Sequence, residues 1–193
     1  METELLLQSI EKHVRLSEEE RELIRSSVRE RKVKKNQFIT HEGAIQRCTN
    51  FVNKGSIRTY FIDPNGEEHI VQFAIEGWWI SDLQSFILQT PATFNVQAIE
   101  DSVILEIPYD TLEMLYEKIP KMERYFRVIT QRAFVSFQQR IVQNISMTAE
   151  ERYLAFREKY PTLEIRIPQR LIAAYVGISA EFLSKVKKRL RKK

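Results

Sequence analysis

The sequence predicts an α+β fold in which an antiparallel β-roll is followed by a long helix and a terminal helix-turn-helix. Three observations support this: evenly spaced glycines in the first half, a long amphipathic stretch after Pro120, and a two-helix pattern in the last 25 residues. We therefore predict three parts. Residues 1–119 form the roll with its flanking helices, 120–146 the long helix, and 147–193 the helix-turn-helix domain.

Glycines mark the turns of the predicted roll. Gly43, Gly55, Gly66 and Gly77 are 12, 11 and 11 residues apart, and short runs of alternating apolar and polar residues lie between and beyond them. The clearest turn is 63–66, where an Asn-Gly pair can take the positive φ angles of a tight hairpin. So many short antiparallel strands must curl into a roll, of the double-stranded β-helix type, rather than form a flat sheet. The eight predicted strands are 31–35, 37–41, 49–54, 56–62, 67–76, 78–80, 94–100 and 103–107.

Helices are predicted on both sides of the roll. Ser17 and Glu20 form a capping box for a helix over 18–27, and a short helix is expected over 111–118. Pro120 then opens a long helix that reaches about Ile145.

The long helix has two apolar stripes, which need two burial partners. We predict that one packs on the roll and the other on the same helix of a second subunit. The stripe with coiled-coil spacing is the expected dimer seam; it comprises Met122, Phe126, Ile129, Ala133 and Ser136. The other stripe comprises Phe134, Phe137, Ile141 and Ile145. A single broad stripe buried within one chain is the alternative.

The last 25 residues fit a helix-turn-helix. Gly177 supplies the turn, small Ala173 lets the helices approach closely, and Ser179 is placed as the N-cap of the second helix. The shared apolar seam comprises Ile172, Val176, Ile178, Leu183 and Val186. The helical period then turns Ala180, Glu181, Ser184, Lys185 and Lys188 outward, where a recognition helix meets base edges. An ordinary pair of packed helices is the alternative.

Positive charge is concentrated beside this motif. Residues 147–193 hold 12 Lys or Arg against five acidic residues, a net of +7, whereas 1–146 have a net of −3. A basic patch next to a helix-turn-helix is typical of a protein that binds the phosphate backbone of double-stranded DNA. The predicted DNA-binding residues are Ser179, Ala180, Glu181, Ser184, Lys185, Lys188, Arg189 and Arg191.

Composition argues against several other classes. No stretch approaches the roughly 20 apolar residues of a membrane helix, and the first residues lack the basic start of a signal peptide. The single cysteine, Cys48, excludes a disulfide framework and a cysteine-ligated cluster within one chain. His13, His41 and His69 lack metal-ligand spacing, and no nucleophile or phosphate-loop motif is present. We expect a cytoplasmic protein that is not an enzyme, makes no membrane contact, and has no metal or cofactor.

This order of elements resembles the cyclic-AMP receptor protein (CRP)/FNR family of bacterial transcription regulators. The similarity extends over about 5–190, and its specific residues are Gly43, Gly55-Ser56, Gly66, the segment 77–83 and the segment 176–179. The resemblance implies a homodimer joined along 120–146, a cyclic-nucleotide-binding-like roll that senses a ligand, and DNA contacts by the terminal domain. RNA polymerase and an unknown small-molecule effector are further candidate partners. A sensing or protein-interaction module whose helix-turn-helix no longer binds DNA is the alternative function.

The candidate effector pocket departs from the members that bind cyclic AMP. Those carry Gly-Glu-Leu and, about nine residues later, Arg-Ser-Ala or Arg-Thr-Ala. Here the corresponding pieces are Ser81-Asp82-Leu83 and Ala92-Thr93-Phe94, so the arginine that binds the cyclic phosphate is missing. We expect a pocket that has drifted or closed, and an effector other than cyclic AMP.

A second departure concerns the C-terminal wing. Winged members continue past the recognition helix into a β-hairpin, which does not follow here before Lys193. The tail 191–193 either replaces some of the wing's phosphate contacts or frays. Residues 164–167 are expected to form a short strand.

Overall fold

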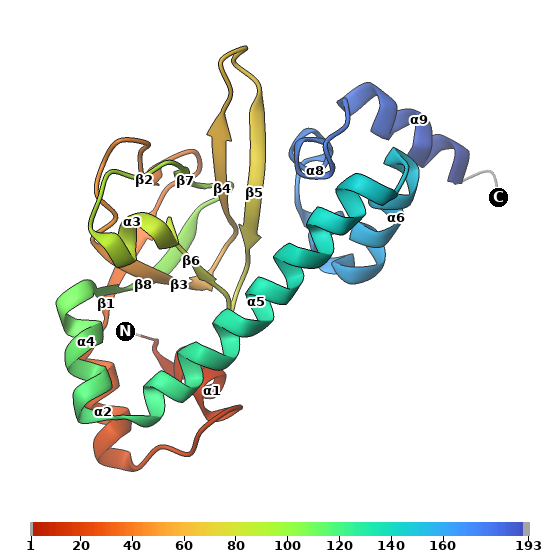
Figure 1. Cartoon of the computed structure of the whole chain (residues 1–193). Coiled ribbons are helices and arrows are strands. Elements are labelled where there is room, and N and C mark those ends of the chain that lie inside the picture. The colour runs from red at the N-terminus through yellow and green to blue at the C-terminus, as the bar shows by residue number, and fades with distance from the viewer. Residues whose placement is uncertain (1, 191–193) are drawn as a thin grey trace. The chain divides into compact units, whose positions relative to one another are not determined.

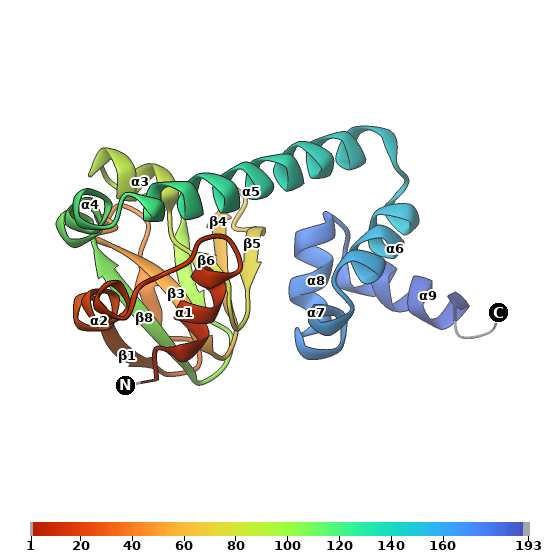
Figure 2. The ribbon, with the colours of Figure 1, turned by 90° about the horizontal axis from the view of Figure 1, so that it is seen from below.

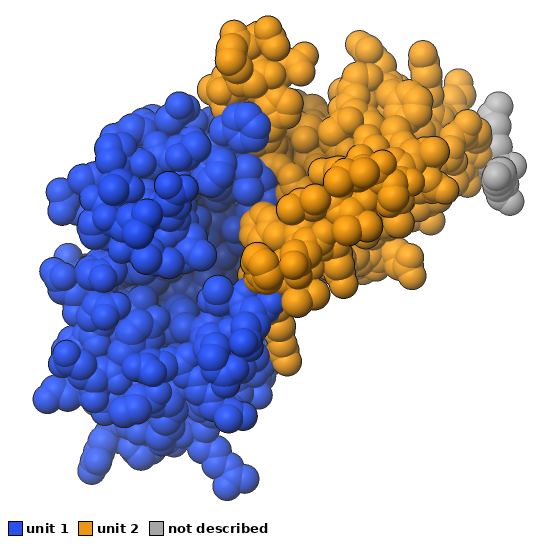
Figure 3. Space-filling view, viewed as in Figure 1, with its two compact units in different colours: residues 1–61, 71–131 blue, residues 62–70, 132–193 orange. Residues whose placement is uncertain are grey.

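The computed structural model describes residues 2–190 (Figure 1). The chain divides into two compact units, one of residues 1–61 and 71–131 and the other of 62–70 and 132–193 (Figure 3). The division falls inside the long helix, so each unit contains part of it. The tip of one β-hairpin belongs to the second unit.

The described residues contain eight strands in two four-stranded antiparallel sheets, as the sequence predicts. The first sheet has the order β1-β8-β3-β6, with bounds Arg29–Val33, Ser102–Pro108, Cys48–Lys54 and Trp79–Ile80. The second has the order β2-β7-β4-β5, with bounds Phe38–Thr40, Asn95–Ala98, Ile57–Ile62 and Glu68–Ala74. Buried aliphatic side chains of both sheets form one cluster: Val33, Val52, Ile57, Ala74, Ile80, Val96, Ala98 and Ile104.

The hairpin between β4 and β5 turns where predicted but with a different geometry. Gly66 has a φ of 83°, whereas Asn65 is not among the residues with positive φ. The N–H of Gly66 donates to the carbonyl of Asp63 (2.9 Å), and the N–H of Asp63 donates to the carbonyl of Glu67 (3.0 Å). The pair Asp63–Glu67 therefore encloses the loop 64–66, in which Gly66 is left-handed, whereas a two-residue type I′ turn needs positive φ at both of its central residues.

Helices cover the first sheet. These are α1 (Glu4–Glu11), α2 (Glu18–Ser27), α4 (Tyr109–Lys118) and the start of α5 (Lys121–Ser146) (Figure 2). The predicted capping box of α2 is present: Ser17 Oγ accepts from the N–H of Glu20, and the Glu20 carboxylate accepts from the N–H of Ser17. Their shared core includes Leu6, Ile10, Ile24, Phe51, Leu105, Leu112, Leu115, Met122 and Tyr125.

The two stripes of α5 differ in how far their own chain covers them. Met122 is fully buried in this core, and Phe126 and Ile129 pack against it, so the predicted dimer seam is covered by its own chain at its N-terminal end. The second stripe is exposed instead. Phe134, Phe137, Ile141 and Ile145 are 61%, 40%, 59% and 82% exposed, and Val135 and Val142 lie exposed beside them. Spacing alone does not reveal which stripe meets α1 and α4, since that depends on tertiary packing.

Four helices follow: α6 (Ala149–Lys159), α7 (Pro161–Arg166), α8 (Gln169–Val176) and α9 (Ala180–Leu190). The last two are the predicted helix-turn-helix. The strand predicted at 164–167 is wrong, because Pro161 starts α7 and Ile167 is its C-cap. Among residues 2–190, no helix combines the length and apolar character needed to cross a bilayer.

Candidate nucleic-acid interface

The turn between α8 and α9 has the geometry that the sequence predicts. Gly177 is left-handed, with a φ of 75°, and the N–H of Ile178 donates to the carbonyl of Ala173 (3.0 Å). Ser179 Oγ accepts from the N–H of Phe182 (3.1 Å), as expected of an N-cap. The predicted seam is buried at Ile172, Ala173, Val176, Leu183 and Val186 and half-buried at Ile178.

The outward face of α9 is also where the helical period places it. The exposed residues are Ser179, Ala180, Glu181, Phe182, Ser184, Lys185, Lys188 and Arg189. Sequence analysis missed one of them, Phe182, a large apolar side chain that is 42% exposed. That these residues contact DNA stays a prediction.

Two basic residues of α9, Lys187 and Arg189, form ion pairs with carboxylates of their own domain. Arg189 forms an ion pair with Glu150 of α6. Lys187 Nζ lies 2.7 Å from Glu164 Oε1 of α7, and this pair is largely buried. Tyr153 of α6 donates to the same carboxylate oxygen (2.8 Å). These contacts fasten α9 to α6 and α7. Arg191, a predicted DNA contact, lies outside the described residues.

The contacts of the Glu164 carboxylate with Lys187 and Tyr153 depend on pH, because they require the carboxyl group to be ionised. Burial alone would raise the pKa of its carboxyl, but Lys187 and the Tyr153 hydroxyl outweigh burial and lower the pKa below its usual value. Burial, and the hydrogen bond to Glu164, raise the pKa of Tyr153 to about 12, so this phenol remains a donor at neutral pH.

We therefore expect the terminal domain to lose stability in acid. A lowered carboxyl pKa stabilises the fold above the unfolded pKa of about 4.3, and that contribution is lost as pH falls below it through the lower folded pKa. Thermal melts recorded as the pH is lowered through this acid range should show a smaller decrease in melting temperature for Glu164→Gln than for wild type. Glu158→Gln, which changes an exposed carboxyl of α6, is the control. Identical pH dependence for Glu164→Gln and wild type would contradict this role.

The candidate effector site is built around Asp82. This residue is fully buried and caps α3 (Leu83–Leu88), a helix that sequence analysis missed. Its Oδ1 accepts from the N–H of Ser85 (3.0 Å), and its Oδ2 accepts from the N–H groups of Thr93 (2.8 Å) and Phe94 (2.9 Å). Backbone donors at a helix start and an adjacent loop could hold an anion, and here the protein's own carboxylate uses them.

The predicted pocket residues, Ser81, Asp82, Leu83, Ala92 and Thr93, differ in burial. Asp82 joins the Thr93 backbone, and Ala92 is buried, whereas the Leu83 and Thr93 residues are exposed and Ser81 is half-buried. Polar residues not identified from the sequence complete the cluster. Gln46 donates its N–H to Ser85 Oγ (2.9 Å) and accepts from Thr40 Oγ1 (2.6 Å). Only the folded chain brings β2 and the segment before β3 beside α3.

A third group combines carboxylates and an imidazole at the β4–β5 turn. Ligand atoms of Asp63, Glu67 and His69 lie within 4.8 Å of one another. Sequence spacing did not single this group out. Asp63 Oδ1 accepts from the N–H groups of Asn65 and Glu67, and its Oδ2 lies 3.0 Å from His69 Nε2. These contacts stabilise the turn and account for the arrangement without an ion.

Comparison with known proteins places this fold in a family. Residues 30–118 match the cyclic nucleotide-binding domain. The regulatory protein HlyX of Actinobacillus pleuropneumoniae is 30% identical over 177 residues, which cover 85% of this chain and 72% of that protein. The fumarate and nitrate reduction regulatory protein of Vibrio cholerae is 27% identical, with 85% and 69% covered.

Solved structures share the fold at lower identity. The c-di-GMP responsive global regulator CLP of Xanthomonas campestris superposes with a TM-score of 0.75 at 14% identity, covering 91% of this chain and 92% of that one. FixK2 of Bradyrhizobium japonicum gives 0.74 at 18% identity, with 86% and 85% covered. The relationship to HlyX, over a chain with a nucleotide-binding-type roll and a helix-turn-helix, shows that this protein belongs to the CRP/FNR family of transcription regulators.

Proposed function

We propose that this regulator is a homodimer that binds an inverted repeat in double-stranded DNA through its paired α9 helices. The main support is the exposed face of α9, which presents Glu181, Ser184, Lys185 and Lys188 directly after a helix-turn-helix turn. The exposed second stripe of α5 supplies an apolar surface for the dimer. Residues 1–119, 120–146 and 147–193 then serve as sensor, dimer helix and DNA-binding domain. The half-sites would lie about 34 Å apart, one turn of the duplex.

Its location and other partners follow from this role. We infer a cytoplasmic protein, because that is where bacterial DNA lies. RNA polymerase is a candidate second partner. The relatives carry names of regulatory proteins, which supports a role without catalysis.

Direct readout assigns different tasks to the side chains of α9. Glu181 can accept from the amino group of cytosine and Lys185 can donate to guanine. We expect Glu181→Ala or Lys185→Ala to lower affinity for the selected site by about 1 to 3 kcal/mol and to relax preference at one base pair. Removal of 191–193 should instead weaken all sequences alike and flatten the dependence on salt. Binding assays on duplexes with single base changes distinguish the two, and the reverse pattern would refute this assignment.

We further propose that cyclic AMP is not the effector. No Lys or Arg lies between Gly77 and Glu100, and the Asp82 carboxylate already uses the amides of Thr93 and Phe94. Loss of one charge-assisted hydrogen bond costs about 1.5 to 3 kcal/mol, or roughly ten- to a hundredfold in affinity. Calorimetry should show no heat with cyclic AMP or cyclic GMP at submillimolar concentration, and DNA binding should need neither. A saturating isotherm in that range would contradict this proposal.

A further inference from the structure

Phe182 is the one large apolar side chain on the exposed face of α9 within the described residues, and a polar, phosphate-facing surface does not explain it. It is 42% exposed, whereas the other exposed residues of α9 within the described chain are Ala180, Glu181, Ser184, Lys185, Lys188 and Arg189. A single exposed aromatic residue is common on protein surfaces. Its position on the helix is what distinguishes this one.

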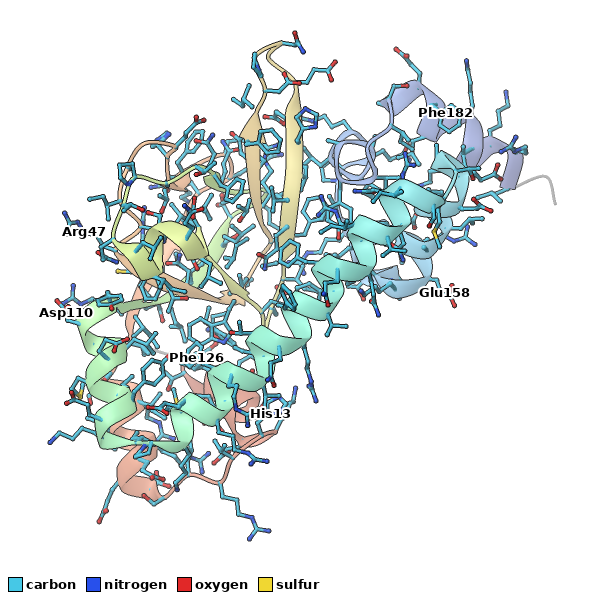
Figure 4. All side chains as sticks on the ribbon, viewed as in Figure 1. His13, Arg47, Asp110, Phe126, Glu158 and Phe182 are labelled. Atoms are coloured by element: carbon cyan, nitrogen blue, oxygen red, sulfur yellow. The ribbon has the colours of Figure 1, made fainter. Side chains whose placement is uncertain are left out.

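Phe182 lies in the first turn of α9 (Figure 4). Its N–H donates to Ser179 Oγ (3.1 Å), so the N-cap fixes the backbone at this residue. It directly follows Glu181 and stands three residues before Lys185, which makes Lys185 its neighbour on the helix surface. Side chains in a helix lean toward its N-terminus, and the first turns of a recognition helix are the part that meets base edges.

The chemistry of this side chain restricts what it can recognise. Phenylalanine has no hydrogen-bond donor or acceptor, so it cannot read the polar edge of a base or bind a phosphate oxygen. The C5-methyl group of thymine is the apolar feature that the major groove offers, and contact with Phe is one of the ways in which proteins read it. Covering both the ring and the methyl group removes apolar surface from water.

We propose that Phe182 contacts the methyl group of a thymine in each half-site and so specifies an A·T pair. This inference rests on the proposed DNA-binding function and identifies a base that the site prefers. In this proposal α9 combines two kinds of base contact: Glu181 and Lys185 hydrogen-bond to polar base edges, and Phe182 contacts a methyl group.

The test combines a protein change with a change of one methyl group in the DNA. The probe is a duplex selected by the wild-type protein from a random library, in which single thymines of one half-site are replaced by uracil. For wild type, loss of the contacted methyl should weaken binding about fourfold, the equivalent of burying one such group. Phe182→Ala should bind the thymine and uracil duplexes equally at that position. Ile165→Ala, which removes an 84% exposed apolar side chain from α7, should discriminate like wild type.

The possible outcomes distinguish failure of the methyl contact from failure of the proposed DNA binding. Discrimination by Phe182→Ala equal to that of wild type at every thymine would overturn the methyl contact and leave DNA binding intact. An equal loss of affinity for all sequences would also overturn it, since Phe182 would then act on the duplex backbone or the fold. Wild-type protein that selects no duplex would overturn both. Because Phe182 is partly exposed, the variant should melt within a few degrees of wild type, which circular dichroism checks.

Discussion

Ile141→Glu is expected to convert the proposed dimer to monomer at micromolar concentration. Ile141 lies in the centre of the exposed second stripe of α5 and is 59% exposed. In a twofold interface each substitution acts twice, and burying one large aliphatic side chain is worth about 1.5 to 3 kcal/mol. The loss is therefore about 3 to 6 kcal/mol before the cost of burying a carboxylate is added. The dimer dissociation constant should rise at least about a hundredfold.

Sedimentation velocity over a range of concentrations measures this change. Gln139→Glu is the matched control, because it adds the same charge two residues away on the opposite side of α5. Its side chain accepts a hydrogen bond from Lys159 (3.3 Å), which glutamate can also accept. An unchanged dimer in Ile141→Glu would show that the partner helix does not cover this stripe. Binding to an inverted repeat should weaken in parallel with dimerisation.

Asp82→Ala should destabilise the roll more than any other carboxylate substitution discussed above. It leaves the N–H groups of Ser85, Thr93 and Phe94 without their acceptor. Each buried donor left unpaired costs about 1 to 3 kcal/mol, and α3 also loses its N-cap. We expect a decrease of about 3 to 5 kcal/mol in the free energy of unfolding, after allowing for water at the partly exposed loop.

Urea unfolding followed by the fluorescence of the two tryptophans measures this loss. Asp110→Ala, at an exposed carboxylate in the first turn of α4, is the control and should change stability by a few tenths of a kcal/mol. If both variants unfold at the same denaturant concentration, Asp82 does not close the site.

Local signals explain which elements the sequence predicted. The capping box at Ser17 and Glu20 places α2 from Glu18 to Ser27, and Gly177 with Ser179 places the turn before α9. These motifs act through neighbouring backbone groups, so they can be recognised without a fold. Thr148 and Glu151 form a second capping box, which marks the start of α6 in the same way and was overlooked.

Contacts between distant segments explain what the sequence did not show. The α5 stripe that packs on α1 and α4 could not be identified from spacing, because both stripes are apolar. Asp82 reaches amides 11 and 12 residues later, and the ion pair between Arg189 and Glu150 joins two helices of the terminal domain. Phe182 carries neither charge nor a hydrogen-bonding group, so the charge pattern that indicates a DNA-binding helix does not identify it.

The most direct test of the central proposal is to select duplexes from a random library with the purified wild-type protein and to weigh the complex. We expect an inverted repeat with half-sites about one helical turn apart, two chains per duplex, and affinity that falls steeply as salt is raised. Selected sites without twofold symmetry, or one chain per duplex, would contradict the account.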